Sequence, residues 1–255
     1  MSFDLVIQGP LDKTSIDKID DISDQFENVI ISHWSENDSS LLQGLKSKNI
    51  TVCHQPTPDR QKSVGVLKDS TFLYSITSTY LGLQKSQSKY TIKMRSDEIY
   101  TDFEPLKEKF LQDDNKFVFG NIFAKKWGRS GFFYHIGDHL FVAKTSSLQK
   151  AYGILYNLYN GRADLTKNSW AIQGLRRKGS VQTAEVVLAL SFVNAKQIQQ
   201  DKWYSFETFK DNFDVIDINL LGKYVASWKH GYQTYSSDNN PFDWGIKTME
   251  DMRDN

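Results

Sequence analysis

The sequence predicts an α/β fold, with a mostly parallel sheet flanked by helices. Over the first hundred residues, short apolar runs rich in β-branched residues alternate with longer stretches whose apolar residues recur every three or four positions. The short runs are apolar at almost every position, which is typical of strands buried on both faces of a parallel sheet. With 255 residues, 39% of them hydrophobic, the chain can bury the core that such a sheet needs.

The elements of the first half follow one another in regular order. Apolar residues at helical spacing up to Phe26 predict a helix that Thr14 or Ser15 caps. Gln55–Val66 contains two prolines and predicts a long connection. The expected strands are Phe3–Gly9, Val29–Trp34, Ile50–His54 and Tyr90–Met94, and the further expected helices are Ser39–Lys48 and Lys68–Gln84. This alternation is typical of parallel strands joined by crossover helices.

The second half is less regular. Residues from Trp203 onward are aromatic and polar without a clear period. The expected strands here are Phe117–Phe123 and Asp138–Lys144, and the expected helices are Ser146–Asn160, capped by Ser146, and Ala184–Ala195. Because no repeat, linker or low-complexity segment interrupts the chain, we expect a single domain over residues 1–255. Its halves would be 1–100, which binds a nucleotide, and 101–255, which shapes a second substrate site and carries the tail.

Composition excludes several classes of protein. Lysine plus arginine equals aspartate plus glutamate, at 31 each, so the basic surplus typical of a nucleic-acid binder is missing. Cys53 is the only cysteine, which excludes an intramolecular disulfide and predicts a small buried side chain in a strand. No secretory signal and no apolar run of about 20 residues is present, so we expect a soluble, cytoplasmic protein with no transmembrane segment. Peripheral contact with a membrane is compatible with this sequence.

The most informative stretch is the end of the fourth expected strand. There Lys93, Arg95, Asp97 and Glu98 follow one another within six positions. In α/β proteins ligands bind beyond the carboxyl ends of the strands, so these side chains are expected at the site. Asp97 could hold a divalent cation against a diphosphate, and Lys93 and Arg95 could share the phosphate charge. The alternative is that Asp97 belongs to an ordinary turn and Glu98 to a solvated flank.

Two further segments lie where they could reach the same edge. Arg60 could hold a phosphate with both arms of its guanidinium, and Gln61 could bind a base or a ribose. Gly9, at the end of the first strand, allows close approach of backbone to a ligand, and Gln8 offers an amide. The structural alternatives are a surface ion pair for Arg60 and a plain turn at Gly9.

Three more residues are candidates for chemistry. Asp138, next to His139, could orient an acceptor hydroxyl, or it could cap a turn. Glu185 opens an apolar helix and could act as a general base. Alternatively, it only stabilises the first turn of the helix through its interaction with the helix dipole. His230 lies in an aromatic tail and could ligate a metal, although a lone histidine is more often structural.

Several short motifs, in order, resemble the WavE lipopolysaccharide-synthesis family. The resemblance covers roughly residues 3 to 196. Its motifs are Gln8-Gly9-Pro10, Arg60-Gln61, Gly82-Leu83, Tyr90 to Asp97, Phe119-Gly120-Asn121, Gly137-Asp138 and Ala184-Glu185 with the apolar helix that follows. The family resembles glycosyltransferases of the GT-A fold, which use a nucleotide-sugar donor and commonly a divalent cation.

The resemblance implies roles for individual residues. Asp97 would take the last position of the acidic metal motif and His230 a late metal ligand, so the implied cofactor is Mn²⁺ or Mg²⁺. Arg95 stands where that motif usually has its first acid, so it could itself neutralise the diphosphate. Glu185 or, failing that, Asp138 would take the proton of the attacking hydroxyl.

The expected function is therefore transfer of a sugar from a nucleotide-sugar donor to a saccharide or glycolipid acceptor. The expected pathway is surface-glycan or lipopolysaccharide synthesis, with inversion at the anomeric carbon. Two alternatives remain open. One is a sugar nucleotidyltransferase, although the glycine-rich, lysine-bearing loop it would need after the first strand is missing. The other is a catalytically inactive sugar- or nucleotide-binding module, which the missing first acid would explain.

Overall fold

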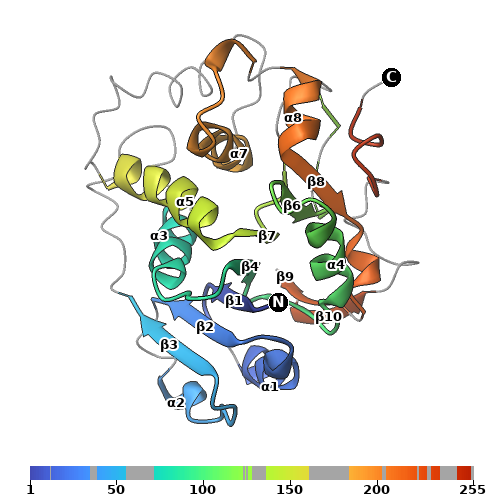
Figure 1. Ribbon diagram of the computed structural model, residues 1–255. Helices are drawn as coiled ribbons and strands as arrows, with labels where there is room; N and C mark the ends of the chain where they lie inside the picture. The colour runs from blue at the N-terminus through green and yellow to red at the C-terminus, as the bar shows by residue number, and fades with distance from the viewer. Residues whose placement is uncertain are drawn as a thin grey trace.

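A computed structural model shows the architecture of the chain (Figure 1). It describes residues 1–11, 13–34, 39–55, 72–122, 124, 126, 127, 136–160, 184–202, 205–222, 224–228, 231–235 and 246–253. Seven strands form the main sheet in the order β3-β2-β1-β4-β7-β6-β8. These strands are β1 (Phe3–Gln8), β2 (Asn28–His33), β3 (Ile50–His54), β4 (Tyr90–Arg95), β6 (Phe117–Gly120), β7 (Leu140–Lys144) and β8 (Phe213–Ile216). The predicted α/β class with a mostly parallel, Rossmann-type sheet is confirmed.

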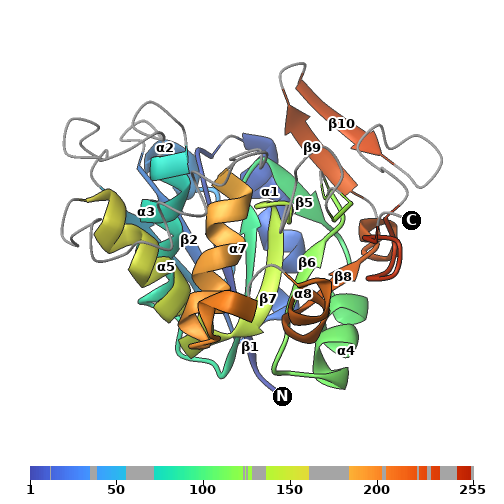
Figure 2. The same ribbon diagram turned by 90° about the horizontal axis from the view of Figure 1, so that it is seen from above.

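Helices cover both faces of this sheet. They are α1 (Lys13–Ile22), α2 (Ser39–Leu42), α3 (Phe72–Leu83), α4 (Glu104–Gln112), α5 (Thr145–Tyr159), α7 (Ala184–Ala195) and α8 (Phe206–Asn212). The side chains of α3, α5, α7 and α8 pack into one hydrophobic core, and those of α1 and α4 pack into a second core. The strands contribute to the two cores with alternate residues, because successive side chains of a strand point to opposite faces. The sheet therefore lies between two helical layers (Figures 1 and 2).

The strand order places a topological switch point between β1 and β4. β1, β2 and β3 are parallel neighbours, and β4 pairs in parallel with the other side of β1. The chain leaves β1 through α1 on one face and reaches β4 through α3 on the other face. Ligands in such sheets bind in the crevice beyond the carboxyl ends of the two strands at this point.

The second half of the chain extends the same sheet. β7 runs antiparallel to both of its neighbours, β4 and β6, while β8 is parallel to β6. Because β7 is antiparallel to β4, the residues that precede β7 lie beside the carboxyl end of β4. A smaller sheet, β10-β9-β5, is made of β5 (Glu98–Tyr100), β9 (Tyr224–Trp228) and β10 (Gly231–Tyr235). Figure 2 shows it at one end of the molecule.

A buried carboxylate ties the amino-terminal end of β1 to the loop before β4. Asp4 is fully buried and accepts five hydrogen bonds. Its Oδ2 accepts from Ser86 Oγ, Gln87 N and Ser88 N at 2.7–2.9 Å, and its Oδ1 accepts from Ser88 Oγ and Asn28 Nδ2. Burial raises the pKa of this carboxyl, but the hydrogen bonds from Ser88, Asn28 and Ser86 lower it by more, so the net shift is downward. Asp4 is therefore a structural ion.

Most predicted elements are confirmed, and the differences have local reasons. Ser15 does not cap α1; it lies inside the helix and its hydroxyl donates to Ser96 O at 2.9 Å. Ser146 is not the cap of α5, since that helix begins at Thr145. β6 ends at Gly120, because the side chain of Asn121 bonds Ile246 O and Ile218 N. α2 is much shorter than expected.

Elements that the sequence did not predict lie mainly after Trp203. Those after it are α8, β8, β9 and β10, and before it β5 (Glu98–Tyr100) and α4 (Glu104–Gln112) also had no predicted range. Cys53 is buried in β3, as predicted. The division into halves at residue 100 stays a prediction. In the part of the chain that the structure describes, no helix is long and apolar enough to cross a membrane.

Candidate functional site

The candidate site lies at the carboxyl ends of β1 and β4. Pairing aligns Gln8 with Arg95, so the two strands end side by side. Beyond them, the Ser96 amide donates to Gln8 O at 2.8 Å and the Gly9 amide donates to Ser32 O of β2 at 3.3 Å. These bonds fix the turns after both strands on a rigid sheet edge, where functional groups are held more precisely than on loops.

Gly9 allows the two turns to approach each other. Its φ is +125°, a conformation that side-chain-bearing residues rarely adopt, and a Cβ there would lie 2.6 Å from Ser96 Oγ. The Ser96 hydroxyl in turn donates to the Pro10 carbonyl. Gly9 therefore permits close approach of the turn after β4. Its predicted approach to a ligand stays a prediction.

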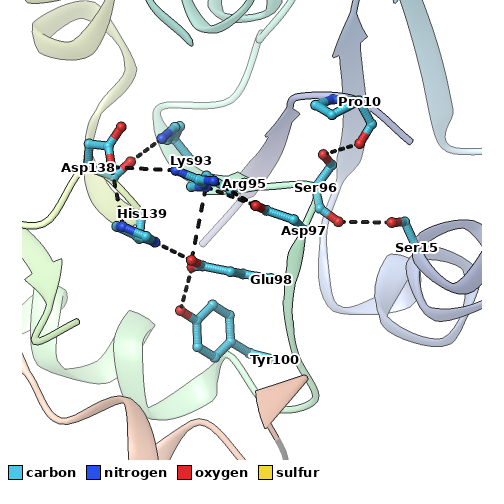
Figure 3. A network of polar contacts seen from close by, with 10 residues as sticks. All are labelled: Pro10, Ser15, Lys93, Arg95, Ser96, Asp97, Glu98, Tyr100, Asp138 and His139. Carbon is cyan, nitrogen blue, oxygen red and sulfur yellow. Dashed lines mark hydrogen bonds and ion pairs between the residues drawn. The ribbon is translucent and has the colours of Figure 1, made fainter. Parts of the chain in front are cut away.

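Six ionisable side chains and one tyrosine meet at this edge (Figure 3). They come from β4, the turn after it, β5, and the segment before β7, and they are Lys93, Arg95, Asp97, Glu98, Tyr100, Asp138 and His139. Three are carboxylates, one is a lysine and one an arginine, so the cluster carries a net charge of minus one when these five groups are charged and His139 is neutral. We call this set the charged cluster.

Arg95 lies at the centre of the charged cluster. Its Nε and Nη2 donate to the two carboxylate oxygens of Asp97 at 2.8 and 2.6 Å. Its Nε is also 4.0 Å from Glu98 Oε1, and its Nη1 is 3.9 Å from Asp138 Oδ1. Burial lowers the pKa of the guanidinium, but the bond to Asp97 and the charges of Glu98 and Asp138 raise it by more, so Arg95 is always charged. One third of its side chain is exposed.

Lys93 lies two residues before Arg95 on β4 and is fully buried. Its ammonium group donates to the backbone carbonyl of Asp138. Burial lowers its pKa to about 8, partly offset by the charge of Asp138. A ligand outside the protein therefore does not reach Lys93 in this conformation, and its visible role is to hold the segment that carries Asp138.

Asp138 is held as a carboxylate by its neighbours. Burial raises its pKa, but His139, Lys93 and Arg95 lower it by more, so the net shift is downward. Its Oδ1 is 3.4 Å from His139 Nε2. A carboxylate with a lowered pKa is a weaker proton acceptor, so this environment favours a charge-pairing role over that of a general base.

Glu98 is the residue of the site that sequence reasoning placed least well. The alternative considered for it was a solvated flank, but it is fully buried in β5. His139 Nδ1 bonds its Oε1, and Tyr100 donates to its Oε2 at 3.3 Å. Burial, first, and the charge of Glu98 raise the pKa of the Tyr100 hydroxyl, which stays protonated. The alternation of Glu98 and Tyr100 on one side of a strand was the available signal.

Glu185 lies in the first turn of α7. Phe192 of α7 stacks on Phe117, the first residue of β6, with ring centroids 4.2 Å apart. Lys196, just after the helix, bonds the Asn115 carbonyl before that strand. The last turn of α7 therefore lies at the amino end of β6. The helix is about 18 Å long over its 12 residues, so its first turn lies well away from that end.

The remaining predicted site residues divide into two groups. Gln8 is buried, and its amide oxygen accepts from Ser78 Oγ of α3 at 3.1 Å, so it fixes that helix to β1. Arg60, Gln61 and His230 lie outside the described residues. Their proposed roles stay predictions.

The described residues do not fit the divalent cation that the resemblance implies. Both oxygens of Asp97 accept from Arg95, and those of Glu98 are bonded by His139 and Tyr100. Mg²⁺ and Ca²⁺ need several oxygen ligands open to them. Over the described ranges, no group of three or more His, Cys, Asp or Glu residues is arranged to hold a metal. The expected cation stays a prediction.

Comparisons with known proteins give only distant likenesses. No family model and no curated protein matches the sequence, so membership of the WavE family stays a prediction. Among solved structures, HddC from Yersinia pseudotuberculosis complexed with GMP-PN is 11% identical at a TM-score of 0.39, over 58% of this chain and 79% of that one. The 4-diphosphocytidyl-2C-methyl-D-erythritol synthase from Anaerococcus prevotii DSM 20548 is 12% identical at 0.42, over 77% and 97%. An active-site mutant of LgtC is 14% identical at 0.42, over 72% and 68%. Likenesses this distant carry no argument about function.

Proposed function

We propose that this protein is a glycosyltransferase that moves a sugar from a nucleotide-sugar donor to a saccharide or glycolipid acceptor. The observation that carries the proposal is the position of the charged cluster at the switch point between β1 and β4. Crevices at such points bind nucleotides in open α/β sheets. Arg95 there presents a permanent, partly exposed positive charge on a rigid strand end. A guanidinium suits a diphosphate because its fork matches phosphate oxygens.

The proposed reaction follows from these positions. The donor diphosphate would lie against Arg95, with the backbone turn at Gly9 alongside it. An acceptor hydroxyl would attack the anomeric carbon from the opposite side, so that its oxygen forms the new bond while the bond to the diphosphate breaks. The nucleoside diphosphate leaves with the bonding electrons, and the hydroxyl proton passes to Glu185. Direct attack inverts the configuration at the anomeric carbon.

The finer parts of the proposal come from the resemblance alone. They are the surface-glycan or lipopolysaccharide pathway and the donor-binding roles of Arg60 and Gln61. The resemblance also implies metal binding by Asp97 and His230, which the bonds of Asp97 to Arg95 do not favour. Asp138 is the proposed second choice as base, although its lowered pKa favours a counter-ion role. The competing functions are an inactive nucleotide- or sugar-binding module and a sugar nucleotidyltransferase.

A ligand screen tests the proposal directly. Thermal shift and slow donor hydrolysis are measured with UDP-, GDP- and dTDP-sugars, each with Mn²⁺, with Mg²⁺ and with EDTA. We expect one donor to raise the melting temperature and release its nucleotide slowly. Asp97→Asn, which loosens the partner of Arg95, should weaken both effects. Asp21→Asn serves as a matched control, since its side chain is 66% exposed on α1.

The outcomes separate the alternatives. Stabilisation by a donor with no turnover, with or without an acceptor, supports the binding module. Formation of a nucleotide sugar from a nucleoside triphosphate and a sugar phosphate supports the nucleotidyltransferase. A folded protein that no donor stabilises refutes the proposed donor site.

A further inference from the structure

The position of Arg95 among carboxylates raises the question of what balances their charge. Asp97, Glu98 and Asp138 all have an oxygen within 4.0 Å of a nitrogen of this one guanidinium. Three carboxylates gathered around one guanidinium need a compensating positive charge, because burying them unpaired is very costly. Here the cation is covalently part of the chain.

The carboxylates beside Arg95 have hydrogen-bond partners within the protein. The two hydrogen bonds to Asp97 form the bidentate arrangement that a guanidinium makes with a carboxylate, and they use both of its oxygens. Glu98 is fully buried, with one oxygen bonded by His139 and the other by Tyr100. The four carboxylate oxygens of Asp97 and Glu98 are therefore already bonded by donors of the protein.

The backbone around Arg95 also holds it in place. It is the last residue of β4, paired in register with Gln8 of β1. The next residue, Ser96, is also fixed: its backbone amide donates a hydrogen bond to Gln8 O, and the Ser15 hydroxyl donates one to Ser96 O. Lys93, two residues earlier on the same face of the strand, donates to Asp138 O and so fixes the segment that carries a third acid. The guanidinium and its carboxylates are thus positioned by the sheet, before any ligand binds.

We propose that Arg95 is the built-in cation of this site, occupying the place among Asp97, Glu98 and Asp138 that a divalent metal would otherwise take. The protein then binds the diphosphate of its donor without a metal ion, through the exposed part of the guanidinium. The three carboxylates position Arg95 and set its charge environment. This inference deepens the proposed function and rests on it where the diphosphate is concerned; the exclusion of metal by Arg95 stands without it.

The experiment measures metal binding alone, so that it can fail separately from the donor screen. Mn²⁺ is titrated into the full chain, and free Mn²⁺ is followed by its electron paramagnetic resonance signal. We expect no specific binding by the wild type. Arg95→Ala removes the built-in cation and leaves three carboxylates, so it should bind Mn²⁺ at least about tenfold more tightly than the wild type. Bound Mn²⁺ should also raise the melting temperature of this variant.

Two matched variants identify the cause. Arg95→Lys keeps a positive charge and should gain no Mn²⁺ affinity. Adding Asp97→Asn to Arg95→Ala removes one ligand and should abolish the gain. Arg95→Gln, which keeps a hydrogen-bond donor to Asp97, replaces Arg95→Ala if the latter does not fold, and should gain Mn²⁺ affinity likewise.

Two results would overturn the inference. One is specific Mn²⁺ binding by the wild type that Asp97→Asn removes. The other is a folded Arg95→Ala or Arg95→Gln variant with no gain in affinity. Failure of the donor screen together with the expected gain would refute the proposed function and leave Arg95 as a structural counter-ion.

Discussion

Substituting Asp4 by asparagine tests the account of the sheet most sharply. The carboxylate is fully buried, and its Oδ2 accepts from two backbone amides and the Ser86 hydroxyl. An asparagine can keep its carbonyl oxygen at the Oδ2 position and turn its NH₂ toward Asn28 and Ser88. The Asn28 amide can flip and the Ser88 hydroxyl can rotate, so the new donors find acceptors. The change then removes the negative charge and little else.

The expected cost follows from the three bonds that remain. A hydrogen bond to a charged group contributes about 1.5–3 kcal/mol and one between neutral groups about 0.5–1.5 kcal/mol, so each bond weakens by about 1 kcal/mol. Asp4→Asn should therefore lower the free energy of unfolding by about 3 kcal/mol, a large share of the total of about 5–15 kcal/mol. Urea denaturation at pH 7 should show a lower midpoint with an unchanged slope. Asp21→Asn, on the surface, should change the free energy of unfolding by less than about 1 kcal/mol.

The same prediction has a pH dependence. Asp4 has a pKa below its usual 3.8 in the folded protein, so the folded state binds fewer protons than the unfolded state in that range. Its contribution to stability is complete above the unfolded pKa and is lost as the pH falls through the folded pKa. The difference in free energy of unfolding between the wild type and Asp4→Asn should therefore shrink in acid. A gap below about 1 kcal/mol at pH 7, or one that does not narrow in acid, would refute the reasoning.

Three further predictions concern the site and its support. Gly137→Ala should destabilise the protein and impair donor turnover, since a Cβ there would lie 2.1 Å from the Ile122 carbonyl oxygen. Gly153→Ala in α5 should be nearly neutral, because its Cβ would meet only ring carbons of Tyr80, the nearest at 3.2 Å; equal melting temperatures for the two variants would contradict this. Lys93 has a pKa of about 8 in the folded protein against a usual 10.5, so between these values the folded state binds fewer protons than the unfolded state. The free energy of unfolding of the wild type should therefore rise by up to about 3 kcal/mol from pH 8 to 10.5, relative to Lys93→Met. Parallel plots of unfolding free energy against pH for the two proteins would exclude the pKa shift. Glu185→Gln should lower kcat by about a hundredfold or more while donor affinity, read by thermal shift, stays unchanged; an unaltered kcat would remove Glu185 as the base.

The regular first half of the fold was predictable because its signals are local. Each strand from β1 to β4 is a short apolar run, and the chain marks its end with a glycine, a histidine or a charged residue. The same locality placed Arg95 and Asp97 at a carboxyl edge, as β4 confirms. α8 and the strands after it were missed because they are short and lack a clear period. β8 pairs with β6 and β9 pairs with β5, so these strands depend on partners far away in the sequence.

The sequence by itself determined which charged residues lie at the end of β4, because chain order and strand period place them there. Only the tertiary structure decided how they pair. The antiparallel entry of β7 brings Asp138 and His139 to this edge from some 40 positions further along the chain. It thereby buries Glu98, adds Asp138 to the carboxylates around Arg95, and shields Lys93 from solvent. Electrostatic roles depend on distance and burial, which long-range strand pairing sets and local sequence does not encode.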